Sequence, residues 1–279
     1  MSYPCPICGN KNTYLKNARM SLYKCDVCDH TFTIIPKDEE EPYNENYFIE
    51  THKNWFANPD TPLFEYCLKV IKDFLKGKKV KMLDVGCGTG SFLKHIHKID
   101  PSMDLTGMDF VTNESPGIKF IAADFLTWDV PEKYNAITNF MVIEHVPDPH
   151  LFVKKMHDAL TDDGILIVNT IHNNSIIYKL ARVLNGVGFS VAHDRLYDHH
   201  HLQHYSNQSL KRVIEMEGME VFKVRNHNYK LKAVDVPSNN PLIAGVYKFA
   251  TLMLFGLSKP FNLGHHQTLF CRKKSRLKK

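Results

Sequence analysis

The chain has 279 residues, of which 43% are hydrophobic and 23% are charged, a composition that excludes wholesale disorder, collagen and coiled coil. Its 35 Lys and Arg residues outnumber its 30 Asp and Glu residues, but six of these bases lie in the last eight residues, RKKSRLKK. The rest of the chain is therefore close to neutral, which argues against a broad phosphate-binding face.

The cysteine spacing and the segment boundaries of the sequence indicate the cellular compartment and the domain organisation. Four of the seven cysteines form two CxxC pairs, which suits a reducing compartment, and the first residues lack the apolar run of a signal peptide. We therefore expect a cytoplasmic protein. The pattern predicts a cysteine unit at 1–36, an acidic and aromatic connector at 37–62, an α/β core at 63–271 with helical insertions at 173–205 and 241–261, and a basic tail at 272–279.

The first unit carries Cys5, Cys8, Cys25 and Cys28 in the spacing C-x2-C-x16-C-x2-C. Two such knuckles can supply four thiolates to one tetrahedral ion, so the spacing predicts a structural Zn²⁺ with no open position for catalysis. A unit of about 36 residues buries too little apolar surface to fold alone, and we expect the metal to stabilise it. The alternative is four reduced cysteines without metal.

From residue 62 onward, strand-like and helix-like segments alternate. The pattern predicts a helix at 62–76, a strand at 80–85, a helix after Gly90, strands at 105–110, 118–122 and 136–140, a helix at 151–160 and a strand at 164–170. This alternation indicates a parallel sheet with helices on both faces. Only VTNESPG separates the second and third strands, so the helix of that crossover must be reduced to a turn.

The last third of the chain departs from this alternation. The sequence predicts an apolar helix at 176–189 that ends near Gly186 or Gly188, a histidine-rich loop with the sequence DHHHLQHYS, and a helix that Ser206 caps and Gly218 ends. Strands follow at 219–226 and 267–272, with an apolar helix at 241–261 between them. Cys67, Cys87 and Cys271 are expected to be small apolar residues.

The turn after the first core strand has the sequence DVGCGTG, which places Asp84 before Gly86, Gly88 and Gly90. Glycines allow a sharp turn and a close approach of a ligand to the main chain. The spacing G-x-G-x-G after an acidic residue differs from the G-x-G-x-x-G of dinucleotide-binding turns.

These residues resemble motif I of the class I S-adenosylmethionine-dependent methyltransferases, and the similarity continues in register over about residues 63–226. The resemblance implies a Rossmann-like, seven-stranded methyltransferase sheet with the small four-cysteine zinc unit at its N-terminus. It implies S-adenosylmethionine as cofactor, with the ribose hydroxyls at Asp109 and the adenine at Asp124 and its neighbour. The cofactor-binding residues expected from it are Asp84, Gly86, Cys87, Gly88, Gly90, Asp109, Phe110, Asp124, Phe125 and Phe140. The short crossover before residue 118 departs from the family pattern.

The order of zinc unit, connector and core is similar to a methyltransferase subgroup linked to bacterial surface-polysaccharide and deoxysugar pathways. The resemblance implies methyl transfer to a small-molecule or glycan-type acceptor. Two alternatives stay open. One is an RNA methyltransferase that binds its substrate through the zinc unit, which the basic tail favours and the neutral body opposes. The other is a non-catalytic protein that binds the cofactor and interacts with a partner. The sequence does not indicate an oligomeric state.

An oxygen or nitrogen acceptor usually loses a proton, and histidine is the side chain best matched to accept it near pH 7. The candidate catalytic residues are His145, after the fourth strand, and His201 and His204 in the histidine-rich loop, where His199 and His200 are their neighbours. Tyr47 and His52 in the connector are candidates for a lid. Methyl transfer also tolerates a site without a base.

The apolar helices at 176–189 and 241–257 have two interpretations. They pack on the core, as apolar stripes usually do, or they cap a hydrophobic acceptor pocket or touch a membrane surface that carries a lipid-linked substrate.

Overall fold

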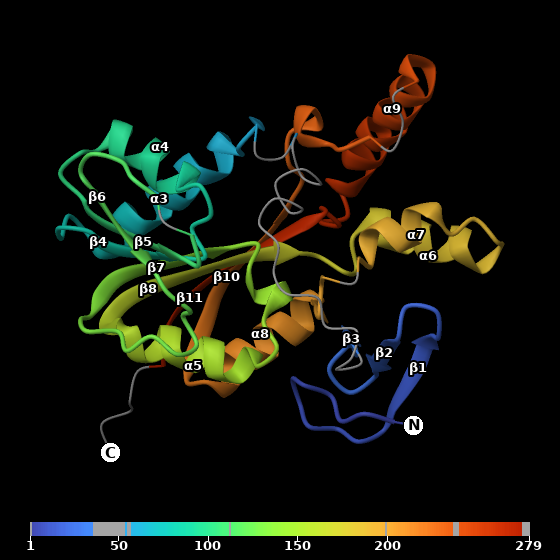
Figure 1. The fold of residues 1–279 in the computed structure, drawn as a ribbon, viewed down its shortest axis with the longest axis horizontal. Helices are drawn as coiled ribbons and strands as arrows, with labels where there is room; N and C mark the ends of the chain where they lie inside the picture. Colours follow the sequence, from blue (N-terminus) through green and yellow to red (C-terminus); the bar gives the residue numbers. More distant parts are fainter. Residues whose placement is uncertain are drawn as a thin grey trace.

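The structure, a computed structural model, describes residues 2–35, 54, 57–111, 113–198, 200–236 and 240–274. Its centre is a seven-stranded sheet in the order β10-β11-β8-β7-β4-β5-β6 (Figure 1). The strands β4 to β8 run parallel to one another, and β11 is antiparallel to β8 and β10. The bounds are Lys81–Val85 (β4), Asp104–Asp109 (β5), Ile118–Ala122 (β6), Tyr134–Phe140 (β7), Leu160–Ile171 (β8), Met219–His227 (β10) and His266–Lys273 (β11). The predicted α/β class with a seven-stranded methyltransferase-type sheet is confirmed.

Helices cover both faces of the sheet because successive strand residues point to opposite sides. The helices α3 (Thr61–Leu75) and α4 (Ser91–Ile99) lie over one face, and α5 (Pro149–Ala159) and α8 (Asn207–Met216) lie over the other. Met82 of β4 belongs to the apolar cluster under α3 and α4, whereas its neighbour Leu83 belongs to the cluster with α5 and α8. The sheet is therefore buried on both sides, and its strand ends are where polar groups become accessible.

The short crossover between β5 and β6 is accommodated without a helix in its described residues. β5 and β6 are adjacent and parallel, with Leu105 paired to Ile118 and Asp109 paired to Ala122. Gly117 has φ of +77°, and a Cβ there would lie 2.6 Å from the ring of His97 on α4. The connection can be this short because its last residue before β6 lacks a side chain and passes close against α4.

The cysteine unit forms a second sheet in the order β1-β2-β3-β9. β1 (Thr13–Asn17), β2 (Leu22–Cys25) and β3 (His30–Thr33) come from the unit itself, whereas β9 (Gln203–His204) comes from the histidine-rich loop. Phe32 pairs with Gln203 and Thr31 pairs with His204 in antiparallel register. The unit is therefore joined to the α/β core by a shared sheet.

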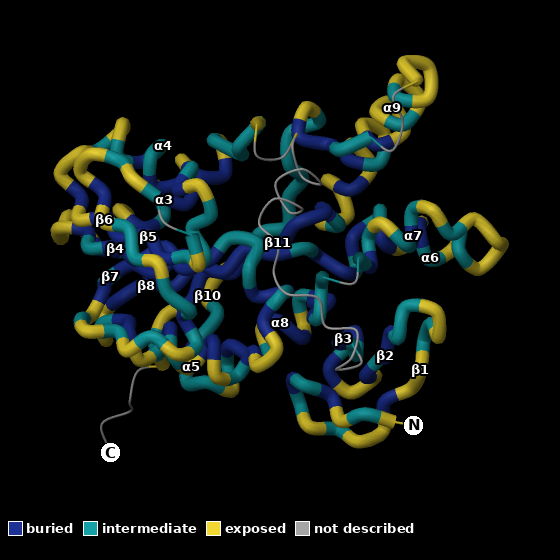
Figure 2. The backbone as a smooth tube through the Cα atoms, in the orientation of Figure 1, coloured by how far each residue is buried: buried dark blue, intermediate teal, exposed yellow. Residues whose placement is uncertain are grey.

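Three helices project from the body on the side away from α4 and β6 (Figures 1 and 2). α6 (Ile176–Gly186) and α7 (Val191–Leu196) replace the single helix expected at 176–189, because the chain turns at Gly188 with φ of +96°. α9 (Pro241–Ser258) is, within the described ranges, the one helix long and apolar enough to cross a membrane by length and composition, and 17% of it is buried.

Candidate functional site

A tight turn follows β4 and leads into α4. φ is +71° at Gly86, +51° at Gly88 and +72° at Gly90, which is left-handed backbone that favours glycine. The amide of Gly86 donates a hydrogen bond to the carbonyl oxygen of Met108 at 2.8 Å. A Cβ at Gly86 would collide with the side chain of Val142. The turn therefore presents main chain, not side chains, at the end of the sheet.

Asp84 places a buried carboxyl beneath this turn. It is 2% exposed, and its Oδ1 accepts a hydrogen bond from Thr138 Oγ1 at 2.6 Å. Removal from water, together with the nearby Asp109, raises the pKa of Asp84 to about 7 against the opposing hydrogen bond from Thr138. A carboxyl in this position suits pairing with a cation that enters the same space.

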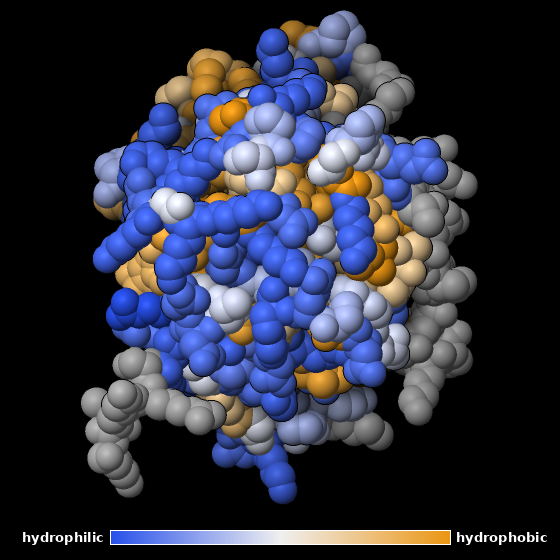
Figure 3. All heavy atoms as spheres, turned by 90° about the vertical axis from the view of Figure 1, so that its left-hand side faces the viewer, coloured by the Kyte–Doolittle hydropathy of each residue, from blue (hydrophilic) through white to orange (hydrophobic). Residues whose placement is uncertain are grey.

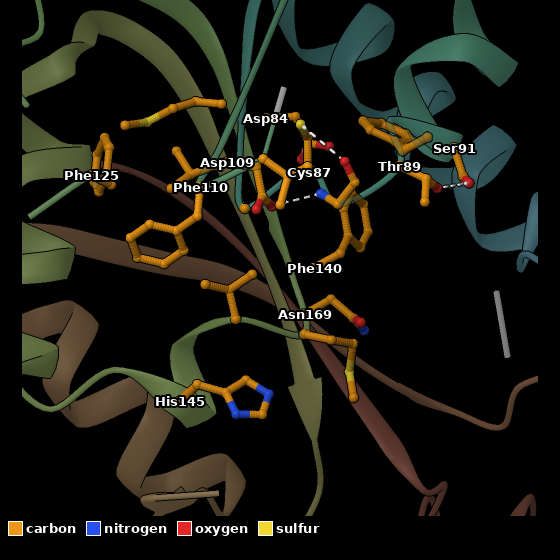
Figure 4. A pocket seen from close by; sticks show the side chains of 18 of the residues that line it. Asp84, Cys87, Thr89, Ser91, Asp109, Phe110, Phe125, Phe140, His145 and Asn169 are labelled. Carbon is orange, nitrogen blue, oxygen red and sulfur yellow. Dashed lines mark hydrogen bonds between the residues drawn. The ribbon is translucent and has the colours of Figure 1, made fainter. Parts of the chain in front are cut away.

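The ends of β5 and β6 add two more carboxylates and two aromatic rings. Asp109 Oδ2 accepts a hydrogen bond from the amide of Gly88 at 2.7 Å, and Asp124 Oδ1 accepts one from the amide two residues later at 2.9 Å. Phe110 is 62% exposed and lies on the same side of the pocket as Phe125 (Figure 4). These groups offer hydrogen-bond acceptors and flat apolar surfaces to one ligand.

The segment after β7 supplies the other wall. Phe140 ends β7 and packs its ring 4.8 Å from that of Phe92, and the short helix η2 (Ile143–His145) follows. His145 Nδ1 lies 2.8 Å from the carbonyl oxygen of His200. Since a carbonyl oxygen only accepts, Nδ1 carries the hydrogen, and Nε2 of the neutral ring keeps its lone pair. That tautomer can accept a proton at Nε2.

The structure separates the three predicted catalytic histidines. His145 lines the pocket, and the ring of His201 lies 4.8 Å from that of His145 but is not part of the pocket lining. His204 Nε2 instead forms a hydrogen bond with Thr33 Oγ1 at 3.0 Å, and burial lowers its pKa to about 3. His204 thus lies between the cysteine unit and the core. Tyr47, His52 and His199, like residues 275–279 of the tail, lie outside the described residues.

The turn and the strand ends surround a cavity of about 410 Å³ at the carboxyl ends of β4, β5 and β7 (Figure 4). β5 and β7 lie on opposite sides of β4, so this is a point at which the strand order reverses and where open α/β sheets bind ligands. Gly90 does not line the cavity but precedes α4 directly. The other predicted cofactor-binding residues all line it: Asp84, Gly86, Cys87, Gly88, Asp109, Phe110, Asp124, Phe125 and Phe140.

A family model described as a methyltransferase domain matches residues 60–224, which include every element around the glycine turn. The chain belongs to this methyltransferase family. The match does not extend to the cysteine unit or to residues beyond β10.

Curated relatives of this methyltransferase align over part of their length. A ubiquinone biosynthesis O-methyltransferase of Neisseria meningitidis is 29% identical over 117 residues, which is 37% of this chain and 48% of the relative. Its counterpart in Glaesserella parasuis is 31% identical over 123 residues, which is 38% of this chain and 50% of the relative. The chain thus spans about half the length of these relatives.

Solved structures share the fold over more of the chain. A 1,6-didemethyltoxoflavin-N1-methyltransferase of Burkholderia thailandensis, solved with its acceptor and S-adenosylhomocysteine, has a TM-score of 0.52 at 11% identity and covers 94% of this chain and 99% of its own. A sarcosine dimethylglycine methyltransferase candidate of Galdieria sulphuraria has a TM-score of 0.55 at 10% identity, over 84% and 99% of the two chains. At these identities the similarity shows the fold alone.

The methyltransferase cavity also contains residues that the sequence did not indicate. Asp60 precedes α3, Tyr229 follows β10 and His266 begins β11, and all three line the cavity. The rings of Tyr229 and His266 stack with centroids 5.0 Å apart. Burial raises the pKa of Asp60 and holds the pKa of His266 well below its usual value, so this wall is neutral imidazole and phenol near pH 7. Neither Tyr229 nor His266 belongs to a sequence motif.

The four cysteines of the N-terminal unit meet at one point. Cys5 Sγ lies 3.5 Å from Cys28 Sγ, Cys8 Sγ lies 3.6 Å from Cys25 Sγ, and all four sulfurs lie within 4.8 Å of one another. A tetrahedral ion with Zn–S bonds of about 2.3 Å separates its sulfurs by about 3.8 Å. The four sulfurs therefore have the spacing that a zinc ion needs.

A second group of ligand atoms borders the pocket. The carboxylate of Glu144 and the ring nitrogens of His145 and His201 lie within 4.8 Å of one another. Glu144 is 1% exposed, Oε2 accepts a hydrogen bond from Thr170 Oγ1 at 2.7 Å, and Oε1 has no hydrogen-bond partner among the described residues. Burial raises the pKa of Glu144 to about 7. This arrangement could share a proton or hold a cation beside His145.

Proposed function

We propose that the protein transfers a methyl group from S-adenosylmethionine to a small-molecule acceptor. The observation that carries this proposal is the cavity, in which the glycine turn, Asp109 and His145 face one space at the ends of the parallel strands. Membership of the methyltransferase family supports it. S-adenosylmethionine supplies an electrophilic methyl group on a sulfonium, so the protein mainly has to position donor and acceptor.

The residues of the cavity fit this cofactor. Gly86 offers main chain alone to a ligand in the cavity, because the side chain of Val142 fills the position that a Cβ would need. Asp109 suits the ribose hydroxyls as an acceptor of hydrogen bonds, and Asp124 with Phe125 suits the polar edge and the face of the adenine. Asp84 suits the ammonium group of the methionine part, since its buried carboxyl lacks a cationic partner among the described residues.

The opposite wall suits an acceptor with a flat apolar body and a nucleophilic oxygen or nitrogen. Phe64, Phe140, Tyr229 and His266 supply apolar and aromatic surface, and His145 supplies an imidazole whose Nε2 can take the acceptor proton. The ubiquinone biosynthesis O-methyltransferases named above act on a small molecule, which supports this acceptor class. A sugar-type acceptor is a narrower form of the same proposal.

The cysteine cluster is part of the proposal as a structural zinc site. Four thiolates at tetrahedral spacing leave the ion no open position, so its role is to hold the knuckles of the unit together. His30 Nε2 donates a hydrogen bond to Oε1 of Gln203 on β9 at 2.9 Å, which connects the cysteine unit to the loop beside His145.

Methyl transfer is tested with labelled S-adenosylmethionine and separate acceptor pools of phenols and quinols, amines, sugar nucleotides, and RNA. We expect label in a small-molecule pool. His145→Asn should lower turnover by about 10²- to 10⁴-fold, as removal of a general base does, while the affinity for S-adenosylhomocysteine stays within about twofold because the ribose and adenine contacts remain. His157→Asn, at a partly exposed hydrogen bond with Asp158 on α5, is the matched control and should change neither.

The acceptor pool in which the label appears decides between the candidate functions. Label confined to RNA would replace this proposal with the RNA methyltransferase. Binding of S-adenosylhomocysteine without label in any pool would favour a non-catalytic cofactor-binding protein. Label in sugar nucleotides would narrow the acceptor to the glycan type.

A further inference from the structure

Two apolar projections lie on one side of the molecule. Leu242 and Phe249 of α9 are 75% and 65% exposed, and Phe189 in the turn after α6 is 70% exposed. Both projections extend away from the sheet and are exposed at their tips (Figures 1 and 2), and α6 contacts α9. We call this surface the apolar face: Val183, Val187, Phe189 and Val191 with Leu242, Ile243, Val246, Phe249, Leu252, Met253, Leu257 and Phe261.

The exposure of α9 is unusual for a helix in water. At about 100° per residue, its exposed large apolar side chains from Leu242 to Leu257 span roughly half of the helix circumference. Only Thr251, Phe255 and Ser258 are buried against the body. Helices with so much apolar surface are normally buried in a core or a membrane, and the opposite side of the molecule is mostly hydrophilic (Figure 3). Exposed apolar surface of this size usually marks a contact with a partner or a membrane.

The charge around the apolar face indicates which occupant. The sequence has no Asp or Glu from 164 to 193 or from 236 to 279. Lys179, Lys248 and Lys259 lie in these segments and are exposed, and no salt bridge to them occurs in the described part of the chain. Within these two segments the charged side chains that accompany the apolar face are therefore all bases, which makes it complementary to a surface that is apolar inside and negatively charged outside.

We propose that the apolar face docks on an anionic lipid bilayer, with the tips of α9 and α6 inserted at the level of the headgroups. Large apolar side chains enter the acyl boundary and lysines reach the phosphates, which is how interfacial helices bind. A second copy of this chain suits the face less well, because a two-fold contact brings the same lysines of the two copies together.

The apolar face also adjoins the cavity. The ring of Phe255 on α9 lies 5.5 Å from that of Tyr229, which lines the cavity, and Asn228 Nδ2 donates to Ser258 Oγ at 2.7 Å. A membrane-bound acceptor would therefore approach from the wall that Tyr229 forms. This last step rests on the proposed function, whereas docking on the bilayer does not.

Vesicle flotation of the zinc-loaded full chain tests the docking. We expect the protein to float with vesicles of phosphatidylcholine and phosphatidylglycerol and much less with phosphatidylcholine alone. Phe249→Glu should weaken vesicle binding about tenfold or more, since one buried apolar side chain is lost and a charge is added. Lys248→Glu should weaken binding to the anionic vesicles only. Met216→Glu, at a 53% exposed apolar residue on α8, is the matched control and should float like the wild type.

Two further measurements keep the result decisive. Phe249→Trp should shift its emission to the blue when anionic vesicles are added. Binding of S-adenosylhomocysteine checks that each variant is folded, and methyl transfer to a water-soluble acceptor without vesicles scores the proposed function separately. The docking proposal is overturned if the wild type stays unbound, if Phe249→Glu and Met216→Glu float equally well, or if lipid-free wild type is a dimer that Phe249→Glu splits and vesicles do not bind.

Discussion

At the residue scale, the carboxyl of Asp84 combines burial with a position on the cavity wall. It is 2% exposed, and this burial raises its pKa to about 7 against the opposing hydrogen bond from Thr138. A ligand ammonium group pairs with the ionised form. Ligand binding therefore requires loss of this proton at lower pH, and the affinity of the site becomes linked to pH.

This linkage gives the first prediction. The affinity for S-adenosylhomocysteine should rise as the pH increases toward about 7, by up to about tenfold per pH unit, and level off above it. Titration calorimetry at stepped pH measures the slope. Asp84→Asn should bind weakly with no slope in this range, while Asp162→Asn, at an exposed ion pair with Lys273, should behave as the wild type. If the affinity of Asp84→Asn still depends on pH in this range, the proton that is lost on binding belongs to another group.

Gly86 gives the second prediction. Its φ of +71° is strained for any other residue, and a Cβ would meet Val142 of the opposite wall. Gly86→Ala should reduce binding of S-adenosylhomocysteine at least about tenfold, because a strain of roughly 1–3 kcal/mol falls on the turn. Gly186→Ala is the matched control, since no atom lies near its Cβ position and its φ is not positive. Equal affinities in the two variants would argue against a close approach at Gly86.

The glycines and acids of the cavity could be predicted because each has a local signature: a positive φ that demands glycine, or an acid at the end of an apolar strand. Asp60, Tyr229 and His266 could not, because they reach the cavity only through the packing of α3 and β11 on the sheet. His204, by contrast, does not line the cavity. Its place in a histidine run suggested chemistry, whereas its ring is buried on Thr33.

At the element scale, β9 joins the cysteine unit to the pocket wall. Gln203 of β9 has two buried contacts: Oε1 accepts from His30 Nε2 at 2.9 Å, and Nε2 donates to the carbonyl oxygen of Val146 at 3.2 Å. Val146 directly follows His145. The side chain of Gln203 thus connects the sheet of the cysteine unit to the turn that carries the pocket histidine.

The third prediction follows from these two bonds. Gln203→Ala leaves His30 and the carbonyl of Val146 without partners, so it should lower the free energy of unfolding by about 1–3 kcal/mol. It should also lower turnover more than the affinity for S-adenosylhomocysteine, because the turn at His145 loses its support. Denaturant unfolding and steady-state kinetics measure both. Gln208→Ala removes one long, exposed bond to Val27 and should cost less than about 0.5 kcal/mol. Similar losses of stability and turnover in both variants would show that β9 does not support the turn at His145.

The longer elements could be predicted from periodicity, but β9 could not. Strands of five or more residues, such as β4 and β7, show apolar runs between turn signals. Two residues carry no period, and the pairing of Phe32 with Gln203 joins positions far apart in the chain. The end of the helix expected at 176–189 was anticipated from its glycines, because Gly188 takes a φ of +96° that a helix cannot continue through.

At the scale of the whole molecule, the cysteine unit and the methyltransferase core share one apolar cluster. Ile7 is fully buried in the same cluster as Phe152, Leu210 and Ile214, which belong to the helices under the sheet. At this boundary His150 Nε2 donates a hydrogen bond to the carbonyl oxygen of Ile7 at 2.9 Å. A unit that completes the core in this way cannot unfold without exposing the helices it covers.

The last prediction therefore concerns cooperativity. The zinc-loaded protein should unfold in one calorimetric transition, and removal of zinc by a chelator should lower the midpoint of that whole transition, because metal binding contributes to the folding free energy of a unit that the core needs. Addition of zinc should restore the midpoint, and S-adenosylhomocysteine should raise it in both forms by mass action. Two separate transitions, with the chelator acting on only the lower one and the ligand on only the upper one, would show instead that the shared cluster and the β3–β9 pairing are too weak to couple the two parts.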